Sequence, residues 1–274
     1  MALVLSFVAV LAGMAVLMTA AWLTQRAAHN AGWVDVFWTY GTGAACSLAA
    51  FWPAPADSVA RQILVALLGA VWSLRLGTYV ALRVAGSSRE DARYAGLRRE
   101  WGAAFQRRMF ALVIVQAPAT ALLTLSVFAA AHGGGASLGL RDLLGALVLL
   151  VAIAGEGLAD EQMRRFKAST PHGGIADTGL WAWSRHPNYF FEWIVWLAYP
   201  VIAFEPAHPL TWATWIAPVL MYLILRYGTG VPALERVMLE SRGEAFRDYQ
   251  ARVSAFIPRP PRKAANPSLQ RKPS

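Results

Sequence analysis

Long apolar blocks separated by polar segments dominate the pattern along the chain. A membrane-spanning helix needs roughly 20 mostly apolar residues, and seven blocks come near that length. We therefore predict an all-α polytopic membrane protein with about seven transmembrane helices. Six or eight spans are the alternatives, because the fifth and sixth blocks are short. The blocks are Ala2–Leu23, Trp33–Phe51, Gln62–Leu82, Phe110–Ala131, Leu143–Leu158, Phe190–Phe204 and Thr211–Tyr227.

The composition points to the same class of protein. Of the 274 residues, 57% are hydrophobic and 15% are charged, whereas soluble domains have about 45–50% and about 25%. A single cysteine, Cys46, excludes a disulfide scaffold. The first apolar block has no Lys or Arg before Arg26 and is longer than the apolar core of a secretory signal, so we predict a retained helix.

The distribution of Lys and Arg predicts the orientation. With seven spans, 22 of the 25 basic residues fall on one side of the membrane. Because cytoplasmic loops are enriched in these residues, we expect the C-terminus in the cytoplasm and the N-terminus outside. We expect one membrane domain over residues 1–258 and a basic, disordered tail over residues 259–274. The tail suits anionic lipid headgroups, and no nucleic-acid partner is expected.

The few polar residues within the apolar blocks gather mostly toward the predicted cytoplasmic side. Each ionisable residue there is a functional-site hypothesis, since its burial in lipid is costly. Arg75 and Tyr79, which lie deeper, are four apart and share one helical face. The others are Asp35, the stripe of Glu156, Asp160, Arg164 and Lys167, the pair Asn188 and Glu192, and Arg226. We interpret the set as lining a cavity enclosed by the helices and open to the cytoplasm. The alternatives are a snorkelling Arg75 and ordinary i,i+4 ion pairs on a solvated helix end.

The densest polar run occupies residues 178–192. Its Arg185 and His186 can bind phosphate or carboxylate. Pro187 suits the first turn of a helix, and the N-terminus of a helix favours an anion. These features predict a phosphate-binding turn, and the alternative is an ordinary amphipathic turn at the membrane interface.

Other kinds of site are excluded by their missing motifs. The sequence has no P-loop, no His-Glu-x-x-His run and no nucleophile-elbow serine, and its two Gly-x-Gly runs lie inside apolar blocks. The five His residues show no ligand spacing, so no metal is expected. Any bound dinucleotide would therefore be held by helices.

Several segments resemble the steroid 5α-reductase family and its bacterial relatives. The run Gly179-Leu-Trp-Ala-Trp-Ser-Arg-His-Pro-Asn-Tyr-Phe-Phe-Glu192 is similar to the C-terminal signature of that family. The likeness is specific over roughly residues 150–258 and thinner before them. The further matching segments are Asp35–Trp38, Arg75–Tyr79, Ala159–Lys167, Gly230–Arg236, Tyr249 and Ala255–Pro258.

The resemblance implies a seven-helix membrane reductase that binds NADPH and reduces a carbon–carbon double bond conjugated to a ketone. The substrate class that it implies is the 3-oxo-Δ4 steroid, reduced to a 5α product as by bacterial 3-oxo-5α-steroid 4-dehydrogenases. By position, Tyr79 matches the carbonyl-polarising tyrosine of the family. The residues assigned to NADPH are Glu156, Asp160, Arg164, Lys167, Trp183, Arg185, His186, Asn188, Tyr189, Glu192, Arg226 and Glu235.

The predicted catalytic residues are Tyr79, Asp35 and Arg75. In animal members of the resembled family a Gln-Glu pair of the second helix joins the tyrosine at the ketone, but here Asp35 is the only acid in the second block. Either Asp35 takes that role or the carbonyl is held differently. Hydride transfer to the β-carbon leaves negative charge on the ketone oxygen, where a preorganised donor stabilises the transition state. We assign that donor to Tyr79, oriented by Asp35 or acidified by Arg75.

A different enzyme class is the main alternative. Membrane methyltransferases of the isoprenylcysteine and phospholipid type also have an Arg-His-Pro-x-Tyr run before a helix, and they use S-adenosylmethionine. A lipid-binding scaffold and a transporter are further alternatives. We favour the reductase because the stripe from Asp160 to Lys167 and the pair Arg75 and Tyr79 fit it better. The expected protein is a monomer in a bacterial inner membrane that takes a hydrophobic, steroid-like substrate from the bilayer.

Overall fold

The computed structural model describes residues 1–87, 90–133, 135–170, 174–205 and 209–262. Within these ranges every regular element is a helix, and the one strand-like pairing there is an isolated bridge between Ser184 and Ser254. The all-α prediction is therefore confirmed. The predicted tail lies outside the described residues from residue 263 onward.

The chain divides into two compact units. Unit 1 comprises residues 1–153 and 194–222, and unit 2 comprises residues 154–193 and 223–274. In chain order the elements are α1 (Ala2–Ala28), α2 (Gly32–Ala50), α3 (Val59–Ala85), α4 (Ala92–Trp101), η1 (Gly102–Ala104), α5 (Phe105–Ile114), α6 (Gln116–His132), α7 (Leu140–Ser169), η2 (Gly179–Ala182), α8 (Pro187–Ile202), α9 (Leu210–Ala213), α10 (Ile216–Tyr227) and α11 (Val231–Arg252).

Five helical stretches in the described chain are long and apolar enough to cross a membrane. They are α1, α3, α7 and the composite stretches Ala92–His132 and Thr211–Arg252. Of the other two predicted spans, α8 has only 16 residues, fewer than the roughly 20 that a bilayer requires. The second of these, α2, has the charged Asp35 in its first turn and is not among the five stretches. The helices are compatible with an integral membrane protein, and the number of seven spans stays a prediction.

Two predicted blocks are each broken into two helices by a proline. Proline lacks an N–H, and its ring clashes with the carbonyl four residues earlier. Pro118 is four residues after Ile114, where α5 ends, and Pro218 is four residues after Thr214, which caps α9. The fourth and seventh blocks therefore begin with a short helix followed by a longer one.

The helix α7 extends about three turns beyond the end of the predicted block at Leu158. The following residues contain no Gly or Pro and are mostly good helix formers. Glu161 also pairs with Arg164 and with Arg165, each at 2.6 Å, at i,i+3 and i,i+4 spacing. The polar stripe is therefore continuous with the apolar helix.

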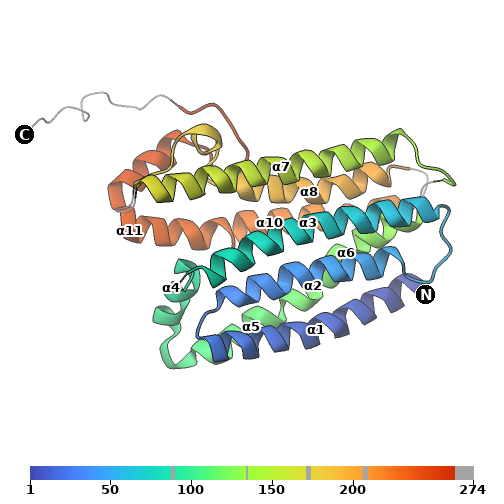
Figure 1. Ribbon diagram of the computed structural model, residues 1–274, viewed down its shortest axis with the longest axis horizontal. Helices are drawn as coiled ribbons and strands as arrows, with labels where there is room; N and C mark the ends of the chain where they lie inside the picture. The colour runs from blue at the N-terminus through green and yellow to red at the C-terminus, as the bar shows by residue number, and fades with distance from the viewer. Residues whose placement is uncertain (88–89, 134, 171–173, 206–208, 263–274) are drawn as a thin grey trace, which may run out of the picture. The chain divides into compact units, whose positions relative to one another are not determined.

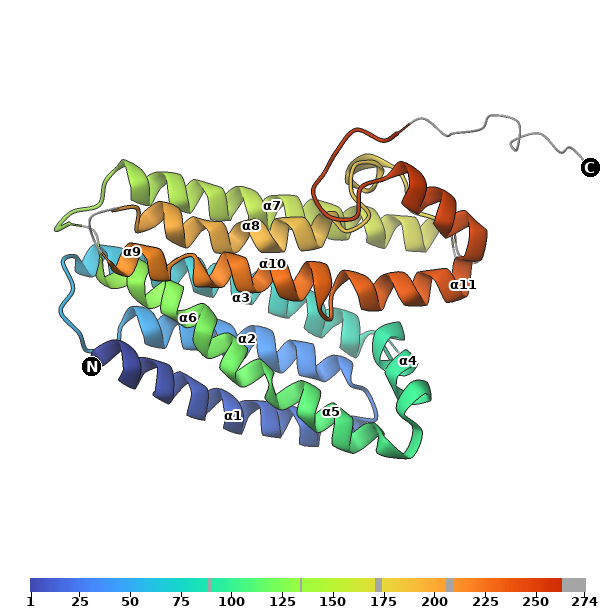
Figure 2. The same ribbon diagram turned by 180° about the vertical axis from the view of Figure 1, so that it is seen from behind.

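Within unit 1, α1, α2 and α3 lie side by side, and α5 and α6 run across one face of α1 and α2 (Figures 1 and 2). Small residues allow α2 and α3 to pack closely, as is common between membrane helices. A Cβ atom on Gly43 would lie only 2.2 Å from the Cβ atom of Ser73. The fully buried Trp72 ring meets the Trp196 ring edge-on, with their centroids 5.2 Å apart.

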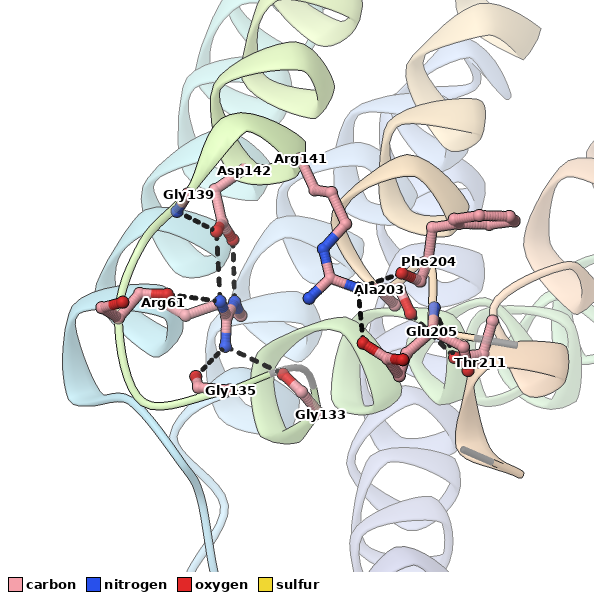
Figure 3. Close-up of polar contacts among 11 residues, drawn as sticks. Arg61, Gly133, Gly135, Gly139, Arg141, Asp142, Ala203, Phe204, Glu205 and Thr211 are labelled. Carbon is pink, nitrogen blue, oxygen red and sulfur yellow. Dashed lines mark hydrogen bonds and ion pairs between the residues drawn. The ribbon is translucent and has the colours of Figure 1, made fainter. Parts of the chain in front are cut away.

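A buried arginine ties three segments together at one end of unit 1 (Figure 3). Arg61 of α3 makes two hydrogen bonds to the Asp142 carboxylate of α7, at 2.7 and 3.1 Å. It also donates to the carbonyls of Gly133, Gly135 and Ser137 in the loop before α7. The two side chains are 2% and 4% exposed, so the ion pair is buried and well hydrogen-bonded.

Candidate active site

Of the segments that carry the family resemblance, those that lie in unit 2 are joined by hydrogen bonds. The Trp181 indole of η2 donates to the Ala159 carbonyl of α7 at 3.0 Å. The Tyr249 hydroxyl of α11 donates to the Trp181 carbonyl at 2.6 Å. Gly243, with φ at 52°, bends α11 shortly before Tyr249, a conformation that favours glycine. These contacts hold the predicted phosphate-binding turn, which includes η2, against α7 and α11.

Arg185 fixes the C-terminal end of α11. Its Nε donates to Glu235 Oε1 at 2.7 Å, and its Nη1 donates to the carbonyls of Gln250 and Val253. The last carbonyls of a helix lack partners within the helix, and a cation there satisfies them. With its side chain 9% exposed, Arg185 has a clear structural role. Its binding of phosphate stays a prediction.

His186 is buried beside the same carboxylate. Its Nε2 lies 3.2 Å from Glu235 Oε1, and its ring stacks on Tyr189 with the centroids 5.7 Å apart. Burial lowers the pKa of His186 below its ordinary value, because desolvation outweighs the attraction of Glu235. The imidazole is therefore neutral near pH 7 and suited to hydrogen bonding.

Acidification is expected to destabilise the protein through His186. Its pKa is lower in the folded chain than the ordinary 6.5, so the unfolded chain binds this proton more readily. Stability is therefore unaffected by His186 above about pH 6.5 and declines as the pH falls below it. The midpoint of thermal unfolding of the purified protein, measured between about pH 7.5 and pH 5, should decline less in His186→Gln. Replacement of the exposed His29 by Gln is the control, and equal slopes in His186→Gln and the native chain would refute the role.

Three carboxylic acids assigned to NADPH are buried. Glu156 and Asp160 of α7 are 4% and 5% exposed, and Glu192 of α8 is 5% exposed. The two helices touch at this level, since a Cβ atom on Gly155 would lie 2.4 Å from the Phe191 ring. Buried carboxylates require donors, and all three acids have interaction partners.

The basic half of the α7 stripe differs from its acidic half. Arg164 and Lys167 are exposed, whereas Glu156 and Asp160 are buried. Arg164 donates two hydrogen bonds to Glu161, at 2.6 and 2.8 Å. Glu161 was not among the predicted residues, although its i,i+3 spacing to Arg164 indicates the pair.

The other residues assigned to NADPH are divided between half-buried and exposed positions in unit 2. Asn188 and Tyr189 occupy the first turn of α8 and are half-buried, as are Arg226 and Glu235. The Arg226 guanidinium lies 4.9 Å from the Tyr227 ring centroid. Trp183 is 48% exposed, which fits an interfacial tryptophan as well as a cofactor contact.

The predicted catalytic tyrosine lies on α3 in unit 1 between two arginines. The guanidinium carbons of Arg75 and Arg83 lie 5.6 and 5.9 Å from the centroid of the Tyr79 ring. These three residues are successive members of an i,i+4 series, so they share one helical face. The half-buried ring packs against a cluster that includes Val36 and Val80. Arg83 was not among the predicted residues, although it continues the i,i+4 spacing of Arg75 and Tyr79.

Asp35 is held by residues around the start of α4. Its carboxylate accepts from the Tyr94 hydroxyl at 2.7 Å and from Arg93 Nη2 at 2.8 Å. Arg93 also bonds Asp91 at 3.0 Å, and Asp91 lies 3.7 Å from Arg83. Burial tends to raise the pKa of Asp91, but the charge and hydrogen bonds of Arg93 hold it below its ordinary value. A chain of charges therefore runs from Asp35 to the arginine beside the predicted catalytic tyrosine.

One cavity in unit 1, of about 340 Å³, is lined by residues that include Met1, Asp57, Phe128 and His132. No residue assigned to the catalytic or cofactor site lines it. The predicted cofactor cavity therefore stays a prediction.

Residues 21–253 match the family described as "Protein of unknown function (DUF1295)", a family that includes steroid 5α-reductase-like membrane proteins. The chain is 25% identical over 226 residues to an uncharacterized protein of Schizosaccharomyces pombe. That match covers 73% of the chain and 64% of the relative, so the chain spans less than two thirds of the relative's length. No solved structure matches the chain. Since the family match extends over most of its length, the chain belongs to the DUF1295 family.

Proposed function

We propose that the protein uses NADPH to reduce the carbon–carbon double bond of an enone lipid. The observation that carries the proposal is the joining of two of the resembling segments, the signature run Gly179–Glu192 and the segment Gly230–Arg236, within unit 2. Glu235 of the segment Gly230–Arg236 accepts a hydrogen bond from Arg185 Nε and contacts His186 of the signature run. Two segments about 50 residues apart in sequence thus share one charged cluster.

The chemistry of the donor set fits NADPH. Its phosphates require cations and N–H donors, which Arg164, Lys167, Arg226 and Asn188 would supply. Its ribose hydroxyls and carboxamide require acceptors, which the buried carboxylates offer. Arg185 and His186 would support this set by fixing the turn that precedes α8.

Tyr79 would act on the substrate rather than on the cofactor. Bound NADPH would supply a hydride to the β-carbon of the enone. As charge develops on the ketone oxygen, the Tyr79 hydroxyl would donate a hydrogen bond to it, and the α-carbon would then take a proton from Tyr79 or from water. Arg75 and Arg83 beside the ring favour negative charge at this place. Asp35 is bound by Arg93 and Tyr94, so it would help to hold α2 against the start of α4 rather than orient the ketone.

The substrate would be an apolar, flat enone that enters from the bilayer. The resemblance favours 3-oxo-Δ4 steroids, and the apolar outer faces of the helices suit a lipid-soluble molecule. An assay of anaerobic NADPH oxidation against a panel of 3-oxo-Δ4 steroids, with the products identified, tests the substrate class.

Binding of NADPH is expected to raise the midpoint of thermal unfolding of the detergent-purified protein. A ligand at 100 times its Kd stabilises a protein by about 2.7 kcal/mol. Asp160→Asn and Asn188→Ala should reduce the stabilisation and raise the KM for NADPH. Replacement of the exposed Asp248 by Asn is the matched control and should change neither. Stabilisation by S-adenosylmethionine in place of NADPH would refute the reductase and support the methyltransferase.

A further inference from the structure

Three exposed arginines at one end of unit 1 form no ion pair with a carboxylate in the described parts of the chain. Arg26 lies in the last turn of α1, and Arg107 and Arg108 lie in the first turn of α5. By contrast, nearby Arg93 and Arg98 are paired with Asp35 and Glu90. No acid in the described ranges therefore neutralises the charge of these three exposed arginines by direct pairing.

The two helix ends that hold these arginines are bound to each other. The Trp22 indole donates to the Gln106 carbonyl at 3.1 Å, and the fully buried Gln25 donates to Gln106 Oε1 at 2.9 Å. Trp22 also meets the Phe110 ring edge-on at 5.2 Å. Gln25 adjoins Arg26, and Gln106 adjoins Arg107. These hydrogen bonds therefore hold the turn of α1 that carries Arg26 against the turn of α5 that carries Arg107.

Aromatic rings accompany the cations. The Arg26 guanidinium lies 4.7 Å from the Trp22 ring centroid, and that of Arg108 lies 5.9 Å from the Trp101 ring centroid. On the apolar side, Leu23 is 53% exposed and Phe110 is 37% exposed. Tryptophan and arginine at the end of an apolar helix are typical of the headgroup level of a bilayer, with acyl chains beside the apolar residues.

We propose that Arg26, beside Trp22 at the end of α1, and Arg107 and Arg108 in the first turn of α5 form a binding site for an anionic phospholipid. Guanidinium groups bind phosphate oxygens through paired hydrogen bonds. The three guanidinium groups would bind the headgroup phosphate, and the exposed Leu23 and Phe110 would contact the acyl chains. This site does not depend on the proposed reductase activity.

Native mass spectrometry of the full-length protein in neutral detergent tests the site. Dioleoyl phosphatidylglycerol should be retained in preference to dioleoyl phosphatidylcholine. The variant Arg26→Gln/Arg107→Gln should bind phosphatidylglycerol at least about tenfold more weakly. The control Arg165→Gln/Arg247→Gln removes two exposed arginines from unit 2, with the same change in net charge, and should bind like the native protein.

Three results would overturn the proposal. They are equal retention of the two lipids, native affinity in the Arg26/Arg107 variant, and displacement of the lipid by an equal concentration of free glycerol phosphate. The last would show that the phosphate alone is recognised. Should the double variant lose its helical circular dichroism, Arg107→Glu alone gives the same test, since it reverses the charge of one exposed side chain.

Discussion

Replacement of Tyr79 by Phe is expected to abolish enone reduction while NADPH binding stays close to that of the native protein. The variant lacks only the phenolic hydroxyl, which we assign to the ketone oxygen. Loss of one preorganised donor at a developing oxyanion lowers kcat by about 10²–10³-fold. Single-turnover oxidation of bound NADPH by an enone measures the chemical step, and NADPH-induced thermal stabilisation measures binding.

Tyr40 offers a matched control for this substitution. It is an exposed tyrosine of α2, and its hydroxyl lies 3.0 Å from Thr78 Oγ1 of α3. Tyr40→Phe therefore removes a phenolic hydroxyl that contacts α3, the helix that carries Tyr79. Its turnover should be close to native. Full turnover in Tyr79→Phe would show that the carbonyl is held by another group, and equal losses in both variants would indicate a general effect on the helices.

Of the substitutions proposed for this protein, Arg61→Met is expected to lower the free energy of unfolding the most. The substitution leaves the Asp142 carboxylate buried without its cation and removes the donors to three loop carbonyls (Figure 3). Removing one partner of a buried ion pair costs about 3–5 kcal/mol. The midpoint of thermal unfolding in detergent should therefore fall by roughly 10 °C.

A neighbouring arginine provides the control for Arg61. Arg141 pairs with Glu205 at 3.0 Å, but their side chains are 35% and 49% exposed. Exposed ion pairs contribute about 0–1 kcal/mol, so Arg141→Met should have little effect. The double variant Arg61→Met/Asp142→Leu removes both charges and should recover part of the loss. A midpoint for Arg61→Met equal to that of Arg141→Met would contradict the structural role of the buried pair.

The apolar blocks predicted the helices well, because hydropathy over 20 residues is a local property of the sequence. Their ends were less predictable. The breaks before Pro118 and Pro218 follow from a known clash and could have been anticipated. The extension of α7 to Ser169 was missed, because the block was delimited by hydropathy although the polar residues after it are good helix formers.

The residues of the candidate site could be proposed from the sequence, but their contacts could not. Periodicity placed Glu156 and Asp160 on one face, and their burial agrees with a functional or structural role. The pairing of Arg185 with Glu235, 50 residues later, has no signal in a single sequence. The same holds for Arg93, which binds the predicted catalytic Asp35 from a different helix.

The sequence by itself determined that this is an all-helical chain of apolar segments whose few polar residues define its candidate chemistry. Hydropathy, spacing and residue type are local quantities, so they can be read without a fold. The tertiary structure decided which charges neutralise each other: Arg61 with Asp142, Arg185 with Glu235, and Asp35 with Arg93. These choices depend on which helices pack together, because a charge in a poorly solvated interior requires a partner within a few ångströms.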